Sequence, residues 1–173
     1  WIGSADFAAY QSGMQQPSRG IVPPEAAGPL VSIARHRLAS RLELFWDDPS
    51  SKIPISASEG FSQWLGHQVD TLRGTGRVRV HACRNAAVVD FGWVYEQIER
   101  VWQSIAADQA DTPICINASS GTWVMQASWI IFKKANGIDW RLFQSSREGG
   151  VQEIRLPPNL TINIGELFRP QRS

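Results

Sequence analysis

The chain has 173 residues, the length of one ordinary domain, and 43% of them are hydrophobic against 19% that are charged. Its 17 basic and 16 acidic side chains leave a net charge of +1, which excludes an overall basic surface for duplex nucleic acid but not a local basic patch. No apolar run approaches the roughly 18 residues that span a bilayer, and no secretory leader is visible. We therefore expect a cytoplasmic protein without membrane contact.

The N-terminal part of the chain predicts little regular structure. Trp1 and Ile2 have the character of a strand end, and residues 3–6 form a tight polar loop in this interpretation. Residues 10–29 contain three glycines and four prolines, a composition that predicts a long loop. Pro29 then suits the first turn of a helix over residues 30–38.

From residue 42 onward, hydrophobic repeats typical of strands alternate with repeats typical of helices. The clearest amphipathic helix covers residues 91–105. Residues 123–135 are apolar on nearly all sides, which predicts a helix buried within the domain or against a partner chain. We predict strands at 42–46, 78–82, 113–116, 140–144, 151–156 and 160–164, and a further helix that starts at Ser56 or Ser58 and ends at Gly74.

This order of elements predicts an α/β fold: a mainly parallel sheet with helices on both faces, followed by a small C-terminal β-hairpin. In such sheets, ligands bind outside the carboxyl ends of the strands. Polar turns follow these ends at residues 3–6, 117–122 and 145–147. We therefore expect the three turns to share one rim.

Common catalytic and cofactor motifs are missing from the sequence. It contains no P-loop, no GxGxxG, no HExxH and no GxSxG. Cys83 and Cys115 lie 32 positions apart in strand-like runs, outside any CxxC, and are expected to be reduced thiols rather than zinc ligands. The three histidines fall on three separate elements. We therefore expect no enzymatic activity, no cofactor and no metal.

The turn Ser119-Ser120-Gly121-Thr122 is the strongest candidate for a binding site. A buried strand precedes it and a helix follows it, and free amides at a helix N-terminus attract anions. Gly121 would let a ligand approach the backbone closely. The alternative is that the hydroxyls only cap the helix, as Ser and Thr commonly do.

Two other turns add polar groups to the same rim. Ser145 and Ser146 precede Arg147, and a guanidinium beside two hydroxyls suits a phosphate. Asp6 could accept a hydrogen bond from a ribose hydroxyl or a base amine. The structural alternatives are a solvated turn for the first group and a helix cap or turn residue for Asp6.

Two stretches of the chain resemble CARF-type sensor domains, most of all those that precede the ATPase module in RtcR-like, sigma-54-dependent transcription activators. These stretches are residues 116–129, INASSGTWVMQASW, and residues 142–148, LFQSSRE. Residues 119–126 match the family's S/P-x-G-T turn and the helix with Met or Gln after it. Residues 1–6 resemble its first-strand loop, and residues 28–30 the start of its first helix.

This resemblance implies a Rossmann-like fold and a homodimer that binds its ligand across the two-fold axis. The implied ligand is a cyclic oligoadenylate, as in CRISPR-associated sensors, or an RNA end with a 2′,3′-cyclic phosphate. Residues 1–173 would form one sensing domain, and an effector domain would lie C-terminal to it in the full-length protein. The expected ligand-binding residues are Gly3, Ser4, Asp6, Ser119, Ser120, Gly121, Thr122, Gln126, Ser145, Ser146 and Arg147.

Three functions are therefore compared. The favoured one is a regulatory domain that binds this ligand and controls a C-terminal effector without catalysis. The second is a ring nuclease that orients a ribose 2′-hydroxyl in line with its own phosphate, with Thr122 and Arg147 assisting. The third is a dimerisation module without a ligand, in which the helix over residues 123–135 supplies the interface.

Overall fold

We analysed a computed structural model, which describes residues 1–2, 4–15, 20–48, 55–74, 76–84, 89–106, 113–146 and 148–160. Three predictions fall outside these residues. They concern Gly3, Arg147 and most of the strand expected at 160–164, and the side chain of Ser4 is also outside the description.

The alternation of strands and helices predicted from residue 42 onward is confirmed, as is the helix near residue 30. The helices are α1 Ser4–Gln15, α2 Pro29–Arg37, α3 Ser58–Gln68, α4 Phe91–Ala106 and α5 Trp123–Asn136. The strands are β1 Leu42–Asp48, β2 Val78–Arg84, β3 Cys115–Asn117, β4 Arg141–Ser146 and β5 Gly150–Ile154. Short 3-10 turns occupy Pro24–Ala26, Ile55–Ala57 and Asp70–Leu72.

The strands form two separate ladders, so the fold is mixed α/β. β1 pairs with β2 in parallel, with Leu42 opposite Val78. β3 pairs with β4 in parallel, and β5 returns antiparallel on the other side of β4. Two of the three strand pairs are parallel, but they belong to two sheets rather than the one sheet predicted. β4 and β5 form a hairpin, and the hairpin predicted from the strands at 151–156 and 160–164 lies partly outside the described residues.

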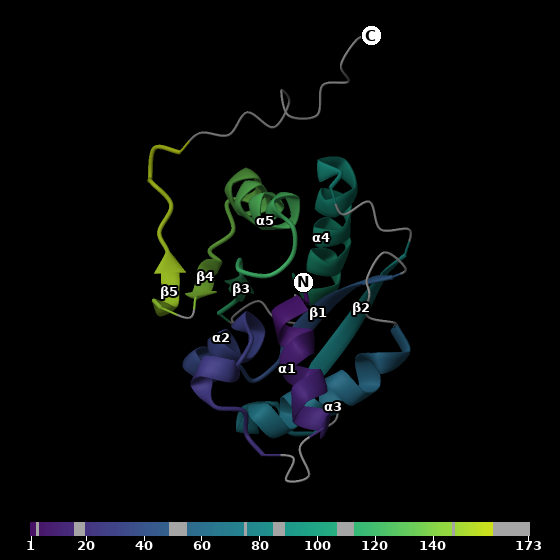
Figure 1. The fold of residues 1–173 in the computed structure, drawn as a ribbon. Coiled ribbons are helices and arrows are strands. Elements are labelled where there is room, and N and C mark those ends of the chain that lie inside the picture. Colours follow the sequence, from purple (N-terminus) through teal and green to yellow (C-terminus); the bar gives the residue numbers. More distant parts are fainter. Residues whose placement is uncertain are drawn as a thin grey trace.

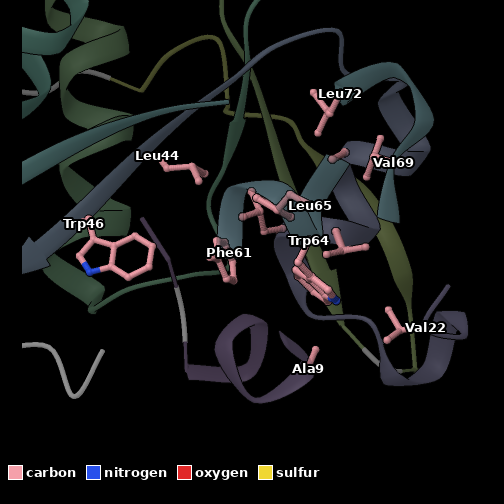
Figure 2. Close-up of a cluster of buried hydrophobic side chains, with 12 residues drawn as sticks. Ala9, Val22, Leu44, Trp46, Phe61, Trp64, Leu65, Val69 and Leu72 are labelled. Carbon is pink, nitrogen blue, oxygen red and sulfur yellow. The ribbon is translucent and has the colours of Figure 1, made fainter. Parts of the chain in front are cut away.

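β1 lies between two hydrophobic cores because successive side chains of a strand point to opposite faces. Leu44 and Trp46 belong to a first core with α1, α2 and α3, whereas Phe45 belongs to a second core with α4 and α5. Figure 1 shows these two groups of helices on opposite sides of β1 and β2. Figure 2 shows the first core, with Phe61 and Leu65 of α3 beside the strand.

Three predictions for the N-terminal part were wrong. Residues 4–6 of the predicted polar loop and the first part of the loop at 10–29 belong to α1, and Trp1 and Ile2 belong to no strand. Packing explains the helix, because the rings of Phe7 and Tyr10 lie 6.5 and 5.5 Å from the ring of Phe61. Tertiary contacts of this kind override weak local helix propensity.

The third helix is shorter than predicted. α3 ends at Gln68 rather than Gly74, because Val69 adopts an extended backbone with φ of −134° and buries its side chain in the first core. Neither predicted serine caps the helix, since the N-cap position is Ala57 and no side chain bonds there. Among the helices in the described ranges, none is long and apolar enough to cross a membrane.

Candidate functional site

The carboxylate of Asp6 connects the start of α1 to two other parts of the chain. Its side chain is fully buried. Oδ1 accepts a hydrogen bond from the backbone N–H of Leu30 in the first turn of α2 (2.8 Å), and Oδ2 accepts one from Oγ of Ser120 (3.1 Å). Because both oxygens bond to protein groups inside the core, we assign Asp6 a positioning role rather than a direct ligand contact.

α2 begins where Asp6 can reach it because Gly28 has no side chain. A Cβ at position 28 would lie 2.2 Å from Oδ1 of Asp6. Pro29 follows at the first helical position, where its fixed φ suits the helix and its missing N–H costs nothing. The Gly28-Pro29 pair therefore directs the N-terminus of α2 at the buried carboxylate.

The turn after β3 is held by its own side chains. Oδ1 of Asn117 accepts from the backbone N–H of Ser119 (2.9 Å), and its Nδ2 donates to Oγ of Ser120 (2.9 Å). This is the turn geometry that Asn favours when its side chain bonds to the backbone two residues later. Asn117 lies in the predicted turn but was not among the expected site residues. Its spacing to Ser119 is the signal that could have identified its role.

A side-chain hydrogen bond connects this turn to the end of β4, next to the backbone bond from the N–H of Ala118 to the carbonyl of Phe143. The backbone N–H of Ser145 donates to Oγ of Ser119 at 2.6 Å. The predicted rim is therefore present for Asp6, for the turn at 117–122 and for Ser145. Ser146 is exposed within β4, and its Oγ accepts from the N–H of Gly149 (2.9 Å), so it belongs to the β4–β5 turn.

Gly121 and Thr122 begin α5 in a constrained backbone. Gly121 has a φ of +90°, a region that favours glycine, and a Cβ there would lie 2.5 Å from Sδ of Met125. Oγ1 of Thr122 caps the helix by accepting from the N–H of Met125 (3.3 Å), while the N–H of Thr122 donates to the Met125 sulfur (3.2 Å). The structural interpretation of Thr122 as a helix cap is thus confirmed.

The outer side of this turn is open to solvent. Gly121 is exposed, and Trp123 is 68% exposed although it is a large aromatic residue. Gln126 lies one turn along α5 and donates weakly to the carbonyl of Gly121 (3.4 Å). The amide of Trp123 stands in the first turn of α5, where the helix supplies no acceptor for it. An anion and a flat ring could both be held here.

In the described ranges, no three His, Cys, Asp or Glu side chains gather in a way that could hold a metal ion. The hydroxyls of Ser119, Ser120 and Thr122 bond within the protein, so the exposed part of the turn is the backbone at Gly121 and the ring of Trp123. Backbone groups can hydrogen-bond to a ligand, and an aromatic ring can stack on a base.

Comparisons with known proteins bear on the fold. No family model matches the chain, and no curated protein matches it. Among solved structures, Enterococcus italicus Csm6 bound to cyclic hexa-2′-fluoro-hexa-dAMP is similar, with a TM-score of 0.59 and 15% sequence identity. The match covers 73% of this chain and 30% of Csm6, so the chain spans less than a third of that protein. The likeness supports the CARF-type fold that the sequence resemblance implies.

Proposed function

We infer that this chain is a regulatory domain that binds a cyclic oligonucleotide at the rim formed by the turn at 117–122 and the start of α5. The observation that carries this inference is that some groups of the turn are bonded inside the protein while others are exposed to solvent. Asp6, Asn117 and Ser119 hold it from inside, while Gly121 and Trp123 remain exposed. The fold shared with Csm6, whose structure contains a cyclic oligonucleotide, adds support.

The chemistry of the turn suits such a ligand. A phosphate is stabilised by free N–H groups and the positive end of the dipole at the N-terminus of α5. Trp123 offers a surface on which a base can stack, and stacking tolerates any base. In this proposal two copies of the domain form a homodimer and share one cyclic ligand across the two-fold axis.

Binding at the rim would control a C-terminal effector. The sequence resemblance to RtcR-like activators makes a sigma-54-dependent ATPase the effector that we propose. The alternative ligand from the same resemblance is an RNA end with a 2′,3′-cyclic phosphate. The proposal contains no catalytic step, because the hydroxyl of Thr122 is committed to capping α5.

A thermal-unfolding screen tests this function. The probes are cyclic oligoadenylates of four and six nucleotides, a linear hexa-adenylate, and short RNAs ending in a 2′,3′-cyclic phosphate or a hydroxyl. A ligand at 100 times its Kd adds about 2.7 kcal/mol to the stability, which raises Tm by very roughly 5–10 °C for a domain of this size. A shift with a cyclic oligoadenylate alone supports the proposal, and a shift with the RNA end alone supports the alternative ligand.

Calorimetric titration of two glutamine variants then places the site. Gln126→Ala removes a side chain beside Gly121. We expect the Kd of this variant for the ligand found in the screen to be about five- to tenfold higher than that of the parent chain. Gln103→Ala is the control, because it makes the same substitution on another helix, at an exposed position of α4, whereas Gln126 is half-buried on α5. No ligand response across the whole panel, from a folded dimer, would instead favour the dimerisation module. Conversion of a cyclic oligoadenylate to a linear product on long incubation would favour the ring nuclease.

A further inference from the structure

A cavity of about 390 Å³ separates the two ladders of strands. One side of it is lined by residues 41–45 at the start of β1, and the other by residues 113–117 in and before β3. Leu30, Ile33 and Ala34 of α2 close it above the sheet plane, and Ile98 and Val101 of α4 close it below. The cavity is therefore a slot between two strand edges, covered by helices on both faces.

Both edges of this slot present backbone groups with no strand partner in the described residues. Leu42 donates its N–H to the carbonyl of Arg77, so the backbone groups of Leu42 and Leu44 face β2. Because bonding alternates along a parallel ladder, the backbone groups of Glu43 and Phe45 face the slot. On the other side, Ile114 accepts from Arg141 and Ala118 donates to Phe143. The same alternation turns the backbone of Cys115 and Asn117 toward the slot.

Several side-chain donors around the slot also lack an acceptor. Buried Nε of Arg37, Nη2 of Arg41 and the indole nitrogens of Trp129 and Trp140 have no hydrogen-bond partner in the part of the chain described. All four residues line the slot. Buried donors are ordinarily paired, so an occupant that brings oxygen acceptors would fit better than a hydrocarbon.

Trp1 marks one end of the slot. It lines the cavity, its ring centroid lies 4.9 Å from that of Phe45, and its Cβ lies 3.3 Å from the position of a Cβ on Gly121. Gly121 follows the carboxyl end of β3, and Phe45, in the middle of β1, is the last residue of that strand to line the cavity. Ser40 and Pro113 line the opposite end. Polypeptide that enters there and ends at Trp1 would run parallel to both strands.

We propose that the slot is the seat of a β-strand of about five residues, joined to the N-terminus of Trp1, that unites the two ladders into one parallel sheet. Five residues cover the stretch from Arg41 to Phe45 on the neighbouring edge. The strand bonds to Glu43 and Phe45 on one side and to Cys115 and Asn117 on the other. Since helices cover both faces, most of its side chains are apolar, and a hydroxyl among them would accept from the buried donors that lack a partner.

Two extended chains test this proposal. One carries a six-residue extension rich in Val and Ile before Trp1, and the other carries a Gly/Ser extension of equal length. In the first chain we expect amide hydrogen exchange at Glu43, Phe45, Cys115 and Asn117 to slow by about tenfold or more relative to the second, together with a higher Tm. Ile21, exposed and remote from the slot, supplies a reference amide whose exchange should stay the same.

Three results would overturn the proposal. Equal exchange in the two extended chains would mean that the slot does not accept a strand. Protection of the four amides in the unextended chain that rises with protein concentration would mean that a second copy fills it. Protection that persists in the apolar extension when Ala34→Trp fills the slot from α2 would place the added strand elsewhere. None of these measurements depends on ligand binding at the rim, so the proposed function and this inference fail separately.

Discussion

The hydroxyl of Ser120 donates to the carboxylate of Asp6, a residue 114 positions earlier in the chain, across 3.1 Å of buried space. The same carboxylate accepts from Leu30, so one side chain fixes the candidate binding turn relative to α1 and α2. The rim thus depends on a contact between two distant parts of the sequence.

Replacing this carboxylate should destabilise the domain. Asp6→Ala leaves the N–H of Leu30 and the hydroxyl of Ser120 without these acceptors, and an unsatisfied buried polar group costs about 1–3 kcal/mol. Urea denaturation measures the loss in unfolding free energy. Asp139→Ala is the control, because that side chain is fully exposed, and it should change the stability by less than about 0.5 kcal/mol. Equal stability of the two variants would contradict the bridging role.

Alanine substitutions at two glycines with positive φ distinguish the cost of backbone strain from the cost of a steric clash. Gly121→Ala places a Cβ 2.5 Å from the Met125 sulfur at a φ of +90°, whereas at Gly137, with a φ of +61°, a Cβ meets nothing within 4 Å. Both variants carry a left-handed backbone cost of about 1 kcal/mol or more. We expect Gly121→Ala to lower Tm clearly further than Gly137→Ala. The same Tm for both would show that Met125 moves aside without cost.

Trp123 should matter for binding and not for folding. Its side chain is 68% exposed and contacts Phe91 edge-on at 5.6 Å. If the proposed ligand stacks on it, Trp123→Ala weakens Kd by about 5- to 150-fold, which corresponds to the 1–3 kcal/mol of a base–aromatic stack. Calorimetric titration measures this, and Trp123→Phe should retain part of the affinity. Unchanged affinity in Trp123→Ala would remove the ring from the site.

The ion pair of Glu43 predicts a loss of stability in acid. Burial raises the pKa of Glu43, but hydrogen bonds from His81 (2.6 Å) and Arg41 (2.5 Å) outweigh it and hold this pKa below its usual 4.5. A carboxyl whose pKa is lower in the folded state contributes stability above the unfolded pKa, and this is lost as pH falls through the folded pKa. The unfolding free energy of the parent chain should therefore fall between pH 6 and pH values below 4.5. In Glu43→Gln this fall should be smaller. Identical pH dependence in both would contradict this.

The elements after residue 42 could be predicted because their hydrophobic repeats match their packing. β1 alternates between two cores, and α4 has one apolar face, so local pattern and tertiary contacts agree. α1 could not be predicted in this way. Its Phe7 and Tyr10 are apolar, but Gly13 and the prolines that follow argue for a loop, and tertiary contacts with Phe61 and Trp64 favour the helix.

The sequence predicted where the candidate site lies, but it did not predict the roles of the individual residues in it. Strand order alone indicated that the turns near Ser119 and Ser145 share a rim, and the hydrogen bond between them confirms it. The burial of Asp6 could not be foreseen, because it depends on the Cβ-free approach of Gly28 from another element. The exposure of Trp123 was equally hidden, since an apolar residue that opens a mostly buried helix has no distinctive sequence signal.

The hydrogen bond from Ser145 to Ser119 also provides a route by which a movement of the turn would reach β4 and β5. Any displacement of the turn pulls on the backbone of β4 at that point, and the antiparallel ladder carries the strain to β5, where Val151 lies opposite Ser145. The chain leaves β5 toward its C-terminal residues. The hydroxyl of Ser119 therefore adds a side-chain contact to the backbone bond between Ala118 and Phe143, and together the two bonds link the turn to the strand that leads toward the exit of the chain.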